Sequence, residues 1–222
     1  MTASFKQLTN FLRQLGTERV PHTEKSFLAH LIGVYRLMQS LGCSEELARA
    51  GLFHSVYGTE GFQGFVLPLD QRQTVRQLIG ERAERLAYWN CAMHRPTLDR
   101  ALLQDEGEPY RIVDRFTHES IELSAAELDD LCRVHLIDYL EQVARSQRWD
   151  IRPAAFRRMA TRLGGVIEEA YHRVFGQHAA MEPCAHRLIL NPPPFRSAST
   201  SGRVIQAKSP GIECLRALAA TP

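Results

Sequence analysis

The sequence has no long hydrophobic run, no concentration of charge and no secretory leader pattern. Its most apolar stretches, such as residues 27–38, are far shorter than the roughly 20 residues that span a membrane, and they contain His or Arg. The 27 basic and 25 acidic side chains nearly balance, without the clustered Lys/Arg face of a nucleic-acid-binding protein. Residues 1–16 are typical of an amphipathic helix rather than a signal peptide. We therefore expect a cytoplasmic protein that binds neither membranes nor nucleic acids.

The sequence also has few cysteines, and they are widely spaced. There are five, and no two form a CxxC pair. An odd number at such spacing argues against a disulfide framework and against a zinc knuckle. The pattern predicts reduced thiols with mainly structural roles.

Proline is concentrated near the C-terminus. Six of the eleven prolines, together with the run SASTSG, lie in the last 40 residues. Such a composition does not pack into regular elements. We predict a helical domain over residues 1–176, followed by a mostly disordered Pro/Ser-rich tail over residues 177–222.

Within the predicted domain, apolar residues recur mainly at the 3.6-residue period of helices. Helices are predicted over approximately residues 5–15, 27–41, 44–54, 69–79, 81–93, 124–142 and 153–175. The helix after Ser124 begins with a capping box, because Glu127 follows three residues later. Residues 111–123 alternate well enough to form a short hairpin. Six or seven helices and at most one small hairpin place the chain in the all-α class.

Three polar residues fall on the apolar stripes of these helices. His30 follows Phe27 by three residues, and His54 continues the stripe of its own helix. Asp138 occupies the inward-facing spacing of the helix that begins after Ser124. A buried carboxylate must be paired, hydrogen-bonded or bound to a metal ion. Two imidazoles and one carboxylate that converge inside a helical bundle would bind zinc, iron or manganese and leave open positions.

The alternative is a structural role for each residue. A single inward histidine is more often a hydrogen-bonded core residue, and an inward aspartate often pairs with arginine. His22, eight residues before His30, is a further ligand, a substrate contact or simply a helix-entry residue. We interpret the other six histidines as surface residues: His94, His118, His135, His172, His178 and His186.

The loop after His54 has the sequence Ser-Val-Tyr-Gly-Thr-Glu-Gly and carries a second cluster of polar groups. Its glycines permit turns that would direct Tyr57, Thr59 and Glu60 into a site beside His54. The competing interpretation is an ordinary helix end with Gly58 after the last turn.

These segments resemble the opening of an HD-superfamily domain. The sequence FLAHLIGVYRLMQSLGCSEELARAGLFH places His30 and His54 24 residues apart, as in the RelA/SpoT-type guanosine tetraphosphate hydrolases. The run LIGERAERLAYWNCA resembles a further helix of those proteins, and Asp138-Tyr-Leu-Glu-Gln142 falls where they carry D-R-L-x-N. The resemblance covers roughly residues 20–145 and implies a helical HD-like bundle. The His-Ser form resembles a bacterial HD-like subfamily.

The resemblance also implies roles for individual residues. It assigns a divalent ion to His30, His54 and Asp138. The aspartate of the usual His-Asp pair is replaced by Ser55, which becomes a weak ligand or a hydrogen-bond donor to the ligands. The two acidic residues of the hydrolase loop are replaced by Gly and Thr, so that Glu60, one place further on, is the candidate general base.

The function expected from these residues is metal-dependent hydrolysis of a phosphorylated small molecule or nucleotide on a degenerate HD-type site. Glu60, Tyr57 and Ser55 are the candidate catalytic residues. The candidate substrate-binding residues are His22, Arg95 and Gln142. No Gly-rich phosphate loop supports this expectation. The alternatives are a non-catalytic HD-like module that binds a ligand or partner, and a non-haem iron oxygenase.

Overall fold

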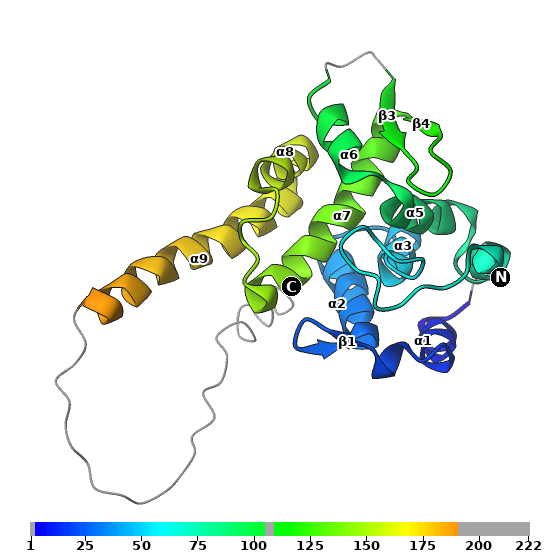
Figure 1. The fold of residues 1–222 in the computed structure, drawn as a ribbon, viewed down its shortest axis with the longest axis horizontal. Helices are drawn as coiled ribbons and strands as arrows, with labels where there is room; N and C mark the ends of the chain where they lie inside the picture. Colours follow the sequence, from blue (N-terminus) through cyan, green and yellow to red (C-terminus); the bar gives the residue numbers. More distant parts are fainter. Residues whose placement is uncertain (1–2, 105–108, 191–222) are drawn as a thin grey trace, which may run out of the picture.

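The computed structural model describes residues 3–104 and 109–190, and for residues 179–190 it describes only the backbone. The part that it describes is mostly helical, with two small antiparallel hairpins (Figure 1). The predicted all-α class is confirmed.

The N-terminal part consists of three helices and a short hairpin. Side chains of serine residues cap each helix: Ser4 opens α1, Ser26 opens α2 and Ser44 opens α3. The elements are α1 (Phe5–Gln14), the 3-10 turn η1 (Thr17–Arg19), β1 (Pro21–His22), β2 (Lys25–Ser26), α2 (Phe27–Ser40) and α3 (Glu45–Phe53). All three helices agree with the predicted ranges. The hairpin β1–β2 was not predicted, because two-residue strands are too short to show an alternating pattern.

The middle of the chain adds three helices and the second hairpin. These elements are η2 (Leu69–Gln71), α4 (Arg72–Ile79), α5 (Glu81–Ala92), α6 (Arg95–Ala101), β3 (Tyr110–Val113) and β4 (Ser120–Leu123). The hairpin β3–β4 lies where the alternating pattern predicts it. Helix α6 was not predicted, because two turns are too few to show a clear helical period of apolar residues.

Helix α7 (Ala125–Ser146) is the centre of the fold. It packs against α2, α3, α5, α8 and α9, and Figure 1 shows it passing through the middle of the helical assembly. Ser124 and Glu127 form the predicted capping box at its start. Because neighbours surround this helix, polar residues at several positions around it are buried. The site described below depends on this packing.

The C-terminal region differs from its prediction in one respect. The segment expected to be a single helix over residues 153–175 is two helices, α8 (Pro153–Leu163) and α9 (Gly165–Leu190). Gly164 and Gly165 both have positive φ angles, which end the first helix and redirect the chain. The expected domain boundary at residue 176 falls within α9, whose C-terminal end extends away from the other helices (Figure 1). The rest of the predicted tail, residues 191–222, lies outside the described residues.

Two further expectations concern membranes and thiols. No helix within the described ranges is both long and apolar enough to cross a membrane. Cys91 and Cys132 are buried free thiols, and Cys43 is a half-buried one. Burial raises the pKa of the Cys91 and Cys132 thiols to about 12, which keeps them protonated and unreactive.

Candidate metal centre

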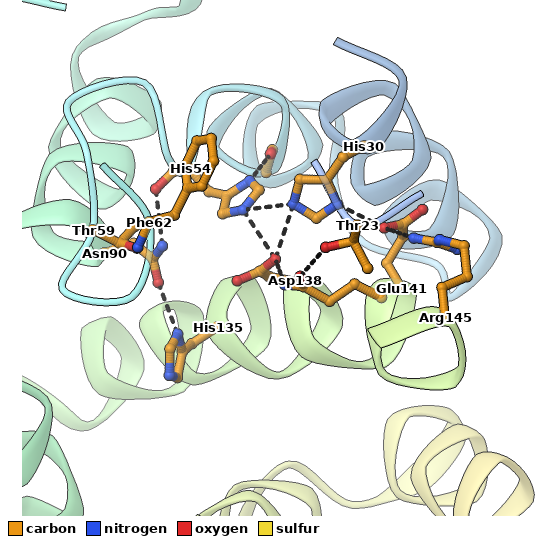
Figure 2. A network of polar contacts seen from close by, with 12 residues as sticks. Thr23, His30, His54, Thr59, Phe62, Asn90, His135, Asp138, Glu141 and Arg145 are labelled. Carbon is orange, nitrogen blue, oxygen red and sulfur yellow. Dashed lines mark hydrogen bonds and ion pairs between the residues drawn. The ribbon is translucent and has the colours of Figure 1, made fainter. Parts of the chain in front are cut away.

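Three helices bring His30, His54 and Asp138 together. His30 lies at the end of the first turn of α2, His54 is the residue at the C-terminal end of α3, and Asp138 lies in the middle of α7. Their exposed fractions are 1%, 0% and 7%, so the contact is inside the protein. Among the described residues, these three form a His/Asp group whose ligand atoms lie within 4.8 Å of one another. Figure 2 shows both imidazoles facing the carboxylate of Asp138.

Hydrogen bonds on the far side of each imidazole fix its orientation and tautomer. His30 Nδ1 lies 2.7 Å from Glu141 Oε2, and His54 Nδ1 lies 2.7 Å from the carbonyl oxygen of Gly51. An ionised carboxylate and a carbonyl oxygen accept but do not donate, so both Nδ1 atoms carry a proton. In the neutral imidazoles, the Nε2 atoms therefore carry lone pairs. Metal-binding histidines commonly have this arrangement, with one nitrogen donating to a carboxylate or a backbone carbonyl.

The two Nε2 atoms face each other across a short gap. They are 3.3 Å apart, and each lies 3.1 Å from Asp138 Oδ1. Three atoms with lone pairs at these separations repel one another unless a cation, either a proton or a metal ion, lies among them. Ligands at the usual 2.0–2.1 Å from one zinc ion would be about 2.8–3.4 Å from one another at octahedral to tetrahedral angles. The three separations between the ligand atoms fit a single divalent ion.

The pKa values of these groups reflect the same crowding. Burial opposes ionisation of Asp138, but the charges and hydrogen bonds of His54 and His30 outweigh it and hold the pKa of Asp138 well below its usual range. Burial also lowers the pKa of His30, but the hydrogen bonds to Asp138 and Glu141 reverse this effect and raise it. Asp138 is thus an anion beside the two imidazoles and is available as a metal ligand.

Side chains from α5 hold the backbone that carries His54. Asn90 Nδ2 donates to the carbonyl oxygen of His54 at 2.8 Å, and Cys91 Sγ lies 3.1 Å from the same oxygen. Gln142 Nε2 donates to Asp138 Oδ1 at 2.8 Å, and its own Oε1 accepts from Thr23 Oγ1 at 3.3 Å. The orientations of Asp138 and of the His54 backbone therefore depend on contacts from α5, α7 and the β1–β2 turn.

A cavity of about 360 Å³ opens beside Asp138. Its walls come from β1–β2, the loop after α3, the start of α6, α7 and the segment that leads into α8. The candidate substrate-binding residues His22, Arg95 and Gln142 all line it, and so does Ser55. Tyr139 and Phe156 form an apolar part of the wall and stack on each other with ring centroids 3.8 Å apart. The volume is in the range of small-molecule sites.

His22 stands next to the triad. Its ring stacks on that of His30 with centroids 4.2 Å apart, and its edge contacts Phe62. The Nδ1 atom of His22 is buried and has no hydrogen-bond partner within the described part of the chain. Burial and the neighbouring His30 lower the pKa of His22 to about 4, so the ring is neutral at pH 7. His22 can therefore accept or donate a hydrogen bond to a molecule in the cavity.

Arg95 gives the cavity a positive charge. It is the first residue of α6, and its guanidinium packs so closely over Gly61 that a Cβ atom there would lie 2.8 Å from Arg95 Nη1. Its side chain forms no ion pair with any described residue. Burial lowers its pKa, and the neighbouring Arg152 and Arg115 act in the same direction. A mostly buried, unpaired guanidinium in a cavity wall is suited to binding an anion.

Two of the predicted catalytic residues do not line this cavity. Tyr57 is fully buried and donates its hydroxyl to Glu84 at 3.1 Å. Glu60 Oε2 accepts from the backbone N–H of Arg95 at 3.2 Å, and its Oε1 lies 3.8 Å from His94 Nε2. The glycines of this loop turn the chain, but they direct Tyr57 into the core and Glu60 to the start of α6. Asp138 is the sole carboxylate among the described residues that line the cavity.

Sequence reasoning missed the role of His135. The sequence pattern predicts a surface position for His135. In the structure it is only 3% exposed, and it lines the cavity. Arg152 Nη1 lies 2.9 Å from His135 Nε2, and because arginine only donates, Nε2 must accept. His135 Nδ1 therefore donates to Asn90 Oδ1 at 3.1 Å (Figure 2). The signal was its position three residues before Asp138, on the same face of α7.

The remaining histidines lie at exposed, partly exposed and undescribed positions. His94, His118 and His172 are exposed, as predicted. His178 is partly exposed and stacks on Trp149. The side chain of His186 lies outside the described residues.

Comparison with known proteins gives one match. Residues 11–95 are similar to a protein family described as a domain of unknown function, DUF6817. This range covers less than half of the chain and includes His22, His30, His54 and Arg95, but not Asp138. No curated protein and no solved structure matches the chain.

Proposed function

We propose that this protein is a metal-dependent hydrolase of a phosphorylated small molecule, with a degenerate HD-type site. His30, His54 and Asp138 are the proposed ligands of a divalent ion, which is manganese, iron or zinc. The observation that carries the proposal is the convergence of three lone-pair atoms 3.1–3.3 Å apart beside a cavity with an unpaired arginine. A divalent ion in such a place supplies Lewis acidity toward a phosphoryl oxygen and a water molecule.

The side chains of the cavity have complementary roles in this proposal. The Arg95 guanidinium binds and orients the anionic group, and the ring of His22, which also lines the cavity, hydrogen-bonds to it. Gln142 holds Asp138 in position, while Thr23 orients the amide of Gln142. Tyr139 and Phe156 offer an apolar surface to the rest of the substrate. Ser55, in the cavity wall next to His54, is placed to hydrogen-bond to a group held beside the triad.

Two alternatives each have an observation in their favour. The scarcity of carboxylates in the cavity wall favours a non-catalytic module that binds an anionic ligand, because Glu60 does not supply a base there. The two-histidine, one-carboxylate ligand set favours a non-haem iron oxygenase. Both alternatives keep Arg95 as a ligand-binding residue, so activity assays must separate them from hydrolysis.

Metal content is the first test. Protein stripped with chelator is reloaded separately with Mn²⁺, Fe²⁺ or Zn²⁺, and the bound metal is measured by elemental analysis. We expect about one ion per chain for at least one of these metals. His54→Ala should lose it, whereas the matched surface substitution His172→Ala should retain it. Thermal unfolding of both variants in chelator checks that each is folded. Failure of the wild type to bind any of the metals would refute the metal site.

Activity then distinguishes the three functions. The loaded protein is assayed for release of inorganic phosphate from phosphomonoesters and nucleotides, with oxygen uptake recorded in parallel. Phosphate release that His54→Ala abolishes supports the hydrolase. Metal-dependent oxygen uptake without phosphate release supports the oxygenase, and ligand binding with neither activity supports the binding module. Either of the last two outcomes overturns the proposed hydrolysis.

A further inference from the structure

Glu141 is a buried carboxylate that lies directly behind one of the proposed ligands. Its side chain is 4% exposed, and its Oε2 accepts from His30 Nδ1 at 2.7 Å. It also forms ion pairs with Lys25 Nζ and, at 2.8 Å, with Arg145 Nη2. One N–H donor and two cations thus surround this carboxylate and favour its charged form. This carboxylate thus connects α2, α7 and the β1–β2 hairpin. Figure 2 shows it between His30 and Arg145.

Helix α2 has space for this carboxylate only because of a glycine. Gly33 follows His30 by three residues and so lies on the same face of α2. A Cβ atom built at Gly33 would collide with Glu141 Oε1, and it would lie 3.1 Å from Lys25 Nζ. Gly33 is inside a helix and has no positive φ, so no backbone conformation requires glycine there. Glycine inside a helix lowers the stability of that helix. The space that Glu141 needs to reach His30 explains why glycine occupies this position.

From these contacts we infer that Glu141 is a positioning residue for His30 as a metal ligand, and that Gly33 provides the space it needs. This inference rests on the proposed metal site. By accepting a hydrogen bond from Nδ1–H, Glu141 keeps the Nε2 lone pair of His30 directed at His54 and Asp138. The negative charge of Glu141 also makes the imidazole a stronger donor. Through Lys25, the same carboxylate holds the hairpin that places His22 against the ring of His30.

A substitution at Gly33 tests the inference without deleting any polar group. The obstructed atoms of Glu141 are at the end of a flexible side chain, so in Gly33→Ala this side chain should turn away while the helix remains intact. We expect the affinity for Mn²⁺ to fall about 10- to 100-fold, which is the usual effect of removing an outer-shell partner. Affinity is measured by calorimetry and by the electron paramagnetic resonance signal of free Mn²⁺.

A double-mutant cycle separates this mechanism from a direct effect on α2. Glu141→Ala alone should lower Mn²⁺ affinity to a similar extent, and adding Gly33→Ala to it should change the affinity less than about threefold. Glu141→Gln retains an acceptor oxygen for His30 Nδ1 but lacks the charge. It should therefore recover part of the affinity that Glu141→Ala loses.

The matched control is Glu84→Gln. Glu84 is also a buried carboxylate held by two arginines, Arg72 and Arg76, but it lies away from the triad. It should lose stability as Glu141→Gln does, yet bind Mn²⁺ with wild-type affinity. Wild-type protein that binds no Mn²⁺, Fe²⁺ or Zn²⁺ overturns the proposed metal site itself. Two other outcomes overturn the inference about Glu141 but leave the metal site standing. In one, Gly33→Ala and Glu141→Ala bind Mn²⁺ as tightly as the wild type. In the other, Gly33→Ala lowers the affinity equally with and without Glu141→Ala.

Discussion

Replacing Arg95 with Met distinguishes a ligand-binding role of this residue from a structural one. A structural role predicts a lower free energy of unfolding in the variant, whereas a ligand-binding role predicts an unchanged or higher one. Arg95 lies at the N-terminus of α6, where a positive charge opposes the helix dipole at a cost of about 0.3–1 kcal/mol. Its guanidinium is mostly buried and has no ion pair with any described residue. Met keeps most of the aliphatic stem and removes the charge. The free energy of unfolding of Arg95→Met should therefore stay the same or rise by up to about 1 kcal/mol.

Ligand binding should show the reverse effect. Loss of a hydrogen bond from a charged group typically costs about 1.5–3 kcal/mol. At roughly 1.4 kcal/mol per factor of ten, the affinity for inorganic phosphate should fall about 10- to 100-fold. Calorimetric titration of phosphate into metal-free and Mn²⁺-loaded protein measures this change. Scanning calorimetry measures stability, and the melting temperature should stay constant or rise by about 1–4 °C.

An exposed arginine provides the control for this substitution. Arg111 pairs with Glu122 across the β3–β4 hairpin, and both side chains are more than half exposed. Arg111→Met should leave phosphate affinity unchanged, because an exposed pair contributes little. If Arg95→Met lowered stability by more than about 1 kcal/mol and left phosphate affinity intact, the reasoning would be refuted and Arg95 would be a structural residue.

Three further predictions concern the stability of the fold. Glu84→Ala leaves the Tyr57 hydroxyl and two arginines without their acceptor, so the free energy of unfolding should fall by about 3–5 kcal/mol in calorimetry. An unchanged melting temperature would contradict this prediction. Glu24 has a φ of 63° in the tight turn of β1–β2, so Glu24→Gly should raise the free energy of unfolding in urea by about 0.5–1 kcal/mol, and a decrease would argue against strain. Burial, together with Arg95 and Arg152, lowers the pKa of His135 well below 6.5, so this ring is neutral when folded and takes up a proton on unfolding in acid. Stability should fall as the pH drops below about 6.5, and His135→Gln should reduce that slope in urea titrations by up to about 1.4 kcal/mol per pH unit; equal slopes would exclude this role.

Much of the local structure could be predicted from short-range patterns. The capping box of Ser124 and Glu127 predicts a helix start, and the hydrogen bonds of the structure confirm it. The inward positions of His30, His54 and Asp138 follow from helical periodicity, and all three are buried. Such features depend on residues within one or two helical turns. The sequence therefore contains nearly all the information that they need.

Errors occurred where a residue's surroundings come from distant parts of the chain. The pattern along α7 predicts His135 on a polar face, but α8 and the segment before it cover that side of the helix. Arg152 then supplies its hydrogen-bond partner. Glu60 and Tyr57 follow His54 closely, yet the loop directs them to different neighbours. The gap between α8 and α9 was missed because the apolar pattern continues through Gly164 and Gly165.

The sequence by itself determined that this chain forms amphipathic helices and that three potential metal ligands face inward. Only the tertiary structure decided that these ligands meet, with Nε2 and Oδ1 atoms 3.1–3.3 Å apart beside a cavity. It also decided that Glu141 reaches His30 across the face of Gly33. Periodicity specifies which side of a helix is buried. The distance between two buried groups depends on how their helices pack against each other. His54 and Asp138 are more than 80 residues apart in the chain, so short-range patterns do not specify that packing.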